Sequence, residues 1–297
     1  MLGKHLEQRC FFYAKKNSSF ILQLFIGVRV LMKNIFSNLF LLIILFFLNC
    51  LSAHGQANDK WRAGSAYSLS GKIYVLTVFI SETEWKYEEK VKLYDDIFEA
   101  QDWLVKQAKK YGKSINFSGG NYGMDKTIRI DNIPVGTGSG TEPTDLITRV
   151  LKKIGYSSPI QFSDWLKKNT DCTNSLVFVI ANKQGRGYAM PYSKGMSYEK
   201  YFLEGCILYK EFSTDFPLNS ASIAHEFLHL FGAWDLYETF SQTKEHEEKA
   251  REIFPDDIML RNVYDINELK IDKLTAWLIG LSAFSEKWYE WFRPNDY

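Results

Sequence analysis

Two histidines, His225 and His229, stand four residues apart in an otherwise apolar stretch, and a glutamate follows the first of them. Residues i and i+4 of a helix share one face, so both imidazoles can present a nitrogen to a single metal ion. Burying two imidazoles and a carboxylate among apolar side chains is costly unless these groups find partners. A metal site is therefore favoured over the simpler interpretation, a buried amphipathic helix with incidental polar residues.

The pattern continues as H-E-x-x-H-x-x-G-x-x-D, which adds Gly232 and Asp235. A glycine can adopt positive φ, end the helix and turn the following residues back, which would make Asp235 the third ligand. Three protein ligands leave a fourth position for water, as in catalytic zinc sites. We therefore predict one catalytic Zn²⁺ held by His225, His229 and Asp235, with Glu226 as the general base.

A second source for the third ligand lies in the charged segment that follows. Its glutamates stand at workable distances along the chain from His229. They are Glu245, Glu247, Glu248 and Glu252. The segment is more simply interpreted as a solvated helix face. Gly232 has a geometric reason only if Asp235 is the ligand, which favours Asp235. His246, in the same segment, is expected to be an ordinary surface residue.

The stretch HEFLHLFGAWD resembles the zinc-binding signature of the metzincin metalloproteases, in the variant with aspartate as third ligand that the snapalysin type carries. Asp257-Ile258-Met259-Leu260 is similar to the methionine turn of that family. The resemblance implies a zincin-like single catalytic domain with a twisted mixed sheet, an active-site helix and C-terminal helices. It also implies peptide-bond hydrolysis, with Met259 as a hydrophobic floor beneath the metal. Some metzincins carry a tyrosine after this methionine; Tyr264 is the nearest here, at an unusual spacing.

The beginning of the chain resembles a leader. An apolar run over residues 35–48 follows Met32, Lys33 and Asn34, and it has the length of a signal sequence rather than of a membrane span. We therefore predict an N-terminal extension and signal peptide over residues 1–55, with Met32 as the start and cleavage after Ala53 or Gly55. Secretion to the periplasm or the cell exterior would follow, with a retained membrane anchor as the alternative. Lipidation at Cys50 is disfavoured by the preceding Asn49.

Residues 56–297 are then predicted to be the catalytic domain, and Cys172 and Cys206 are its two cysteines. In an exported domain they are either a disulfide or two buried free thiols. Neither has a partner at the short spacing that zinc ligands show. The net charge of +1 gives no reason to expect nucleic-acid binding.

Apolar and helical periodicity predicts a mixed α/β (α+β) domain. Strands are expected over residues 72–81, 175–181 and 205–212, helices over 83–111, 242–253 and 267–281, and a loop over most of 119–144.

Three functions fit these features. The first is an exported zinc endopeptidase, whose protein or peptide substrate lies along an edge strand at Gly185–Tyr192 or Gly205–Phe212. The second is a zinc hydrolase acting on a non-protein amide. The third is a secreted binding module with a structural zinc, which Glu226 argues against because a structural site needs no general base. Contact with a membrane is expected only through an uncleaved leader.

Overall fold

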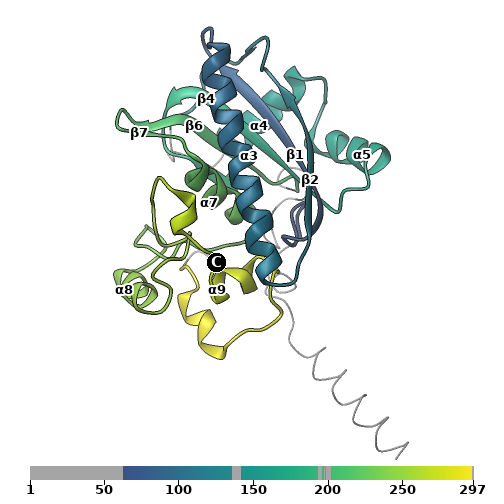
Figure 1. Ribbon diagram of the computed structural model, residues 1–297. Helices are drawn as coiled ribbons and strands as arrows, with labels where there is room; N and C mark the ends of the chain where they lie inside the picture. The colour runs from purple at the N-terminus through teal and green to yellow at the C-terminus, as the bar shows by residue number, and fades with distance from the viewer. Residues whose placement is uncertain (1–62, 136–141, 193–195, 197, 199–201, 296–297) are drawn as a thin grey trace, which may run out of the picture. The chain divides into compact units, whose positions relative to one another are not determined.

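A mixed sheet forms the centre of the computed structural model, and its order is β2-β1-β4-β6-β5 (Figure 1). The three predicted strands are confirmed as its parallel centre: β1 (Gly71–Ser81), β4 (Asn174–Gln184) and β6 (Gly205–Ser213). The remaining strands are β2 (Ile115–Tyr122) and β3 (Ile128–Arg129), both parallel to β1, and β5 (Tyr188–Met190) and β7 (Phe216–Pro217), both antiparallel to β6. The architecture is therefore mixed α and β, as predicted.

The structure describes residues 63–135, 142–192, 196, 198 and 202–295. The chain divides into two units, Met1–His54 and Gly55–Tyr297, and every described residue belongs to the second. The predicted leader, its start at Met32 and the cleavage positions lie outside the described residues. Within the described ranges, no helix has both the length and the apolar character needed to cross a membrane.

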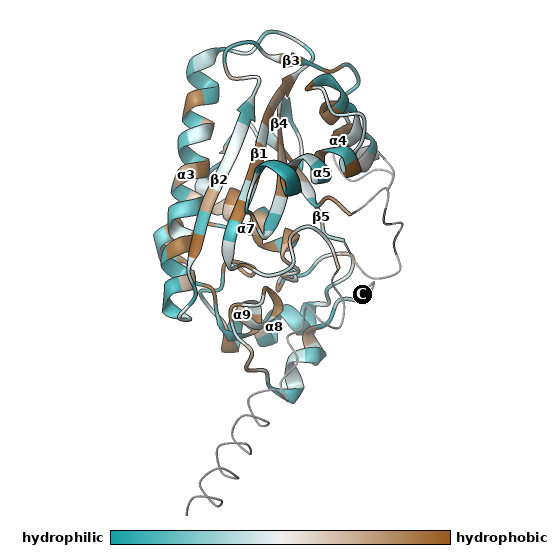
Figure 2. Ribbon diagram, turned by 90° about the vertical axis from the view of Figure 1, so that its right-hand side faces the viewer, coloured by the Kyte–Doolittle hydropathy of each residue, from teal (hydrophilic) through white to brown (hydrophobic). Residues whose placement is uncertain are grey.

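Helices cover both faces of the sheet. The central strands carry apolar side chains at consecutive positions, and consecutive side chains point to opposite faces, so both faces must be covered. Val75 of β1 and Phe178 of β4 belong to the core under α3 (Tyr87–Lys110) and α7 (Ser220–Leu230). Leu76 and Val177 belong to the core under α4 (Glu142–Lys153) and α5 (Pro159–Asn169). Figure 2 shows the apolar strands between these two helical layers.

Helix α7 carries the histidine motif and is fixed to the sheet by aromatic packing. The Phe227 ring lies edge-on to Phe117 of β2 and to Phe178 of β4, with centroids 5.5 Å apart in each pair. Phe227 is 1% exposed, and burying such a side chain contributes roughly 1.5–3 kcal/mol. This contact faces the sheet and leaves the neighbouring side of α7 for the site.

The chain after α7 forms the lower part of the unit in Figure 1, and its helices are short. They are α8 (Lys244–Ile253), η1 (Ile266–Glu268), α9 (Lys273–Leu278) and η2 (Lys287–Phe292). The predicted helix over residues 267–281 is wrong in its first half. Leu269 and Ile271 are buried from an extended segment whose Lys270 bridges to Asp257, and α9 starts only after the cap at Asp272.

The predicted loop over residues 119–144 is also wrong at its start, because β2 continues to Tyr122. Glycine in this segment indicates close packing rather than a turn. A Cβ on Gly119 would lie 2.1 Å from the carbonyl oxygen of Val75, so a larger residue could not sit beside β1 at this place.

Candidate metal centre

The motif helix begins at a side-chain cap and ends at a backbone cap. The Asn219 side chain accepts from the N–H of Ser222 at 2.9 Å, which satisfies one of the open donors of the first turn. At the other end Gly232 has φ 95°, with bonds from Gly232 N to His229 O (2.8 Å) and from Ala233 N to Leu228 O (3.1 Å). This pair of bonds is a Schellman cap, and it turns the chain back over the helix end.

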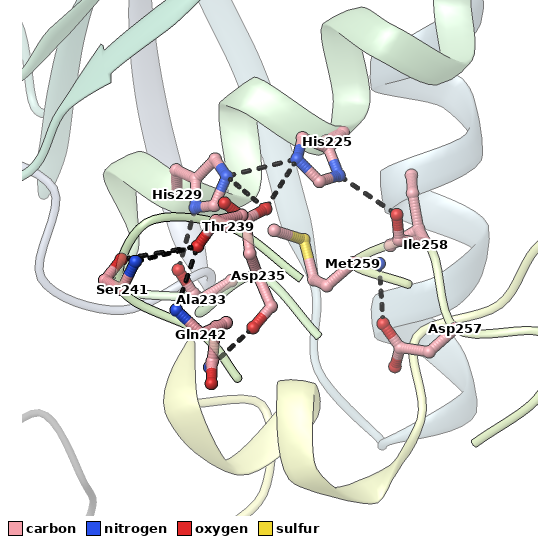
Figure 3. Close-up of polar contacts among 10 residues, drawn as sticks. All are labelled: His225, His229, Ala233, Asp235, Thr239, Ser241, Gln242, Asp257, Ile258 and Met259. Atoms are coloured by element: carbon pink, nitrogen blue, oxygen red, sulfur yellow. Dashed lines mark hydrogen bonds and ion pairs between the residues drawn. The ribbon is translucent and has the colours of Figure 1, made fainter. Parts of the chain in front are cut away.

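The turn brings Asp235 to the two histidines, as predicted (Figure 3). The Oδ1 atom of Asp235 lies 3.2 Å from the Nε2 of His225 and 3.2 Å from the Nε2 of His229. The two Nε2 atoms are 3.1 Å apart. These three residues are the cluster of potential metal ligands found among the described residues.

Both imidazoles are oriented through their other nitrogen. The Nδ1 of His225 lies 3.0 Å from the carbonyl oxygen of Ile258, and the Nδ1 of His229 lies 2.9 Å from that of Ala233. A carbonyl oxygen only accepts, so each Nδ1 must donate. In the neutral imidazole each Nε2 then carries a lone pair that points into the cluster.

With both imidazoles neutral, three acceptor atoms converge: the two Nε2 atoms and the Oδ1 of Asp235. The buried Oδ1 of Asp235 has no hydrogen-bond donor assigned to it. Burial alone would raise the pKa of Asp235, but the charge and hydrogen bonds of His229 and His225 hold it well below its usual range. Burial alone would lower the pKa of His229, but the Asp235 carboxylate raises it to about 9. The site thus favours a cation, and two imidazoles with one carboxylate are a donor set that suits Zn²⁺.

The turn predicted to lie beneath the metal contacts both ligand segments. Ile258 accepts from His225, and the N–H of Leu236 donates to the carbonyl oxygen of Met259 at 2.9 Å. Met259 is fully buried, and Figure 3 shows its side chain extending toward the histidine–aspartate cluster. The turn is tied by Asp257, whose carboxylate accepts from the N–H of Met259 and from that of Asp272, both at 2.8 Å.

A cavity of about 510 Å³ opens beside the cluster, and His225 and Glu226 line it. Its walls come from the loop between β4 and β5, from β6 and β7, from α7, and from the chain after Met259. The apolar part is formed by Leu208, Phe212, Phe216, Pro217, Leu218 and Leu260. Glu226 is partly buried at this surface and lies outside the ligand cluster, which leaves its carboxylate available to act as a base.

Three of the four rival glutamates have other partners. Glu247 accepts from the N–H of Glu238 at 2.7 Å and pairs with Arg251 at 2.6 Å. Glu252 pairs with Lys249, and Glu248 lies 3.8 Å from Lys244. None of the four glutamates belongs to the ligand cluster.

Two further expectations need correction. Cys172 and Cys206 are both free thiols. Cys206 lies on β6, whereas the Sγ of Cys172 lies 3.2 Å from the Oγ of Ser118 on β2, and β1 and β4 separate these two strands. Only Cys206 is buried, so the alternative of two buried thiols also fails for Cys172.

His246 is not a simple surface residue. It is partly buried, its Nδ1 donates to the Oε1 of Gln242 at 2.6 Å, and its ring packs edge-on against Trp291. Tyr264 does not line the cavity; it is 54% exposed, its ring packs against Phe216, and its hydroxyl donates to the carbonyl oxygen of Asp215.

Two residues that support or line the site were not predicted from the sequence. Gln242 is buried, and its Nε2 donates to the carbonyl oxygens of Asp235 (2.7 Å) and Phe292 (2.9 Å), which ties the ligand loop to the C-terminal segment. Tyr237 lines the cavity with its ring 6.1 Å from that of His225. Burial, together with the charges of Asp235 and Glu226, raises the pKa of Tyr237, so its phenol stays protonated. Its position two residues after Asp235 was the available signal.

No protein-family model matches the chain, and no curated protein shows significant similarity to it. The interpretation of the site therefore rests on its own geometry.

Proposed function

We propose that this protein is a zinc-dependent endopeptidase with a zincin-like fold, related to the metzincins. The observation that carries the proposal is the convergence of the Nε2 atoms of His225 and His229 with the Oδ1 of Asp235. With neutral imidazoles all three are acceptors, and the bonds that each Nδ1 donates to a backbone carbonyl leave a cation as the partner that satisfies them together. Zn²⁺ bound there would supply a Lewis acid and lower the pKa of water toward ~7.

The residues around the cluster have separate tasks in this proposal. Glu226 takes a proton from the attacking water and delivers it to the leaving amine, which its place beside His225 on the cavity wall permits. Tyr237, protonated at working pH, donates a hydrogen bond to the oxygen on which negative charge develops. Met259 fills the space beneath the ligands and keeps water away from that side.

A peptide substrate would lie extended along the margin of the cavity. The loop Gly185–Gly187 lines this margin and leads into β5, the last strand of the sheet on that side. The apolar walls at Leu208, Phe216 and Leu218 suit a large apolar side chain next to the scissile bond.

The test is a comparison of wild type with Glu226→Gln. After zinc loading and dialysis, both proteins are expected to hold one zinc per chain, measured by atomic emission. Wild type should cleave denatured casein, whereas the glutamine variant should lose on the order of 10²–10⁴-fold in rate because it lacks the base. A glutamine variant that retains both zinc and full activity would overturn the catalytic assignment. Zinc without cleavage in wild type would favour a structural site.

We further propose that the protein is exported through the N-terminal leader. Expression from Met32 in a bacterial host, followed by N-terminal sequencing of the extracytoplasmic fraction, should give a chain that starts at His54 or Gln56. Recovery of the uncleaved chain in the membrane fraction would instead identify a retained anchor.

A further inference from the structure

Arg186 lies on the cavity wall between two glycines that hold it beside the candidate base. The N–H of Gly185 donates to the carbonyl oxygen of Glu211 at 3.0 Å, and a Cβ on Gly185 would lie 2.7 Å from the Tyr209 ring. A Cβ on Gly187 would lie 3.1 Å from the Oε1 of Glu226. Both close approaches keep the loop against the site, so Arg186 projects from a fixed backbone.

The guanidinium of Arg186 brings a positive charge to the cavity wall. Arg186 lines the same cavity as His225, Glu226 and Tyr237. The guanidinium therefore shares this cavity with the phenol that we place at the developing charge. It is within reach of groups that bind beside the scissile bond.

Arg186 differs from the other two arginines on the cavity wall. Arg251 pairs with Glu247 at 2.6 Å. Arg261 contacts Asp256 at 3.3 Å and Glu268 at 3.2 Å. Within the part of the chain that the structure describes, the Arg186 guanidinium makes no ion pair or hydrogen bond.

We propose that Arg186 is a specificity-determining residue that binds a carboxylate of the peptide substrate next to the scissile bond. This inference rests on the proposed endopeptidase function and names its substrate class. The planar guanidinium matches a carboxylate with two parallel hydrogen bonds. The carboxylate belongs either to an acidic side chain or to a free C-terminus, and the two sources share this chemistry.

The test uses internally quenched octapeptides with a central Phe and an amidated C-terminus. Glu or Gln is placed in turn at each flanking position, and a second set ends in a free carboxylate shortly after the Phe. For zinc-loaded wild type, kcat/KM should favour Glu over Gln about tenfold at one position, or the free acid over the amide in the second set. Arg186→Gln should bring this ratio close to one. Arg186→Glu should instead favour a peptide with Lys over the peptide with Gln at the same position.

Arg129→Gln is the matched control, because it removes the same charge from an exposed arginine that does not line the cavity. It should keep the wild-type ratio. Equal kcat/KM values for the Glu and Gln peptides in wild type would overturn the assignment of Arg186 while leaving the endopeptidase function in place. A preference for Glu that survives in Arg186→Gln would do the same.

A peptide-binding measurement distinguishes the role of Arg186 from the endopeptidase function on which it rests. Rhodamine-labelled versions of the same peptides are titrated into zinc-loaded Glu226→Gln, with and without Arg186→Gln, and followed by fluorescence anisotropy. Tighter binding of the acidic peptide that depends on Arg186, without cleavage by wild type, would refute the endopeptidase proposal and keep the carboxylate site. Absence of both cleavage and Arg186-dependent binding would refute both.

Discussion

The Nδ1 of His225 and the carbonyl oxygen of Ile258 lie 3.0 Å apart, although 33 residues separate them in the chain. This bond sets the tautomer of the first ligand from the turn that carries Met259. The second histidine is oriented by Ala233, from the helix cap itself. The two histidines on one helix are thus oriented by two different segments.

Asp235→Ala should lower zinc affinity by more than about 100-fold, because it removes the one anionic ligand. Zinc retained after dialysis against a graded series of chelators measures this loss. Glu248→Gln is the control, since it removes an acid of the rival segment and should leave affinity unchanged. Loss of zinc in the control but not in Asp235→Ala would support the later-helix ligand set.

Gly232→Ala should destabilise the protein by about 1–2 kcal/mol, because φ 95° is unfavourable for a residue with a Cβ. It should also weaken zinc binding, since the turn places Ala233 and Asp235. Gly155→Ala is the matched control: Gly155 has φ 103° and open space where a Cβ would be. Urea unfolding should show similar losses for both variants, and zinc titration should separate them. Equal zinc affinities would refute the link between the cap and the ligand.

Tyr237→Phe should retain zinc and fold but reduce kcat on the order of 10²-fold, because it removes a donor aimed at developing charge. Peptide cleavage and zinc content measured on the same sample test this expectation. Tyr264→Phe serves as the comparison, since that hydroxyl donates to the carbonyl oxygen of Asp215 and does not line the cavity. A larger effect at Tyr264 would reverse the two assignments.

Asp257 should make stability fall as pH rises from about 4 to 6. Burial raises the pKa of Asp257 from 3.8 to about 6, so between these values the folded state binds a proton that the unfolded state has lost. The resulting loss, complete above pH 6, is on the order of 2–3 kcal/mol. Urea unfolding of wild type and Asp257→Asn across pH 4–7 isolates this loss of stability, because an asparagine side chain does not titrate in this range. A stability difference between the two proteins that does not change with pH would contradict the expectation.

The ligand cluster was predictable because it is local and its spacing follows helix geometry. His225, His229, Gly232 and Asp235 lie within one helix and its cap, and each position had a geometric reason in the sequence. The central strands were predictable for a similar reason, since their apolar residues are consecutive.

The missed features depend on contacts between distant segments. β2 continues through Gly119 because this glycine fits closely against Val75. The sequence alone does not distinguish a glycine that packs closely in a strand from a glycine in a loop. Leu269 and Ile271 fit a helical pattern, yet they are buried from an extended segment that pairs with Asp257. Gln242 bridges Asp235 and Phe292, and no local signal marks a glutamine for that task.

The two hydrogen bonds accepted by Asp257 also determine when the site can form during synthesis. β1, β4 and β6 precede α7 in the chain, so the sheet can assemble while the C-terminal segments are still being made. Asp257 has its second donor only when Asp272 has emerged, and only then is the carbonyl of Ile258 held against His225. If the cluster binds zinc as proposed, we expect metal acquisition to follow the emergence of Asp272, after the strands of the sheet have been made.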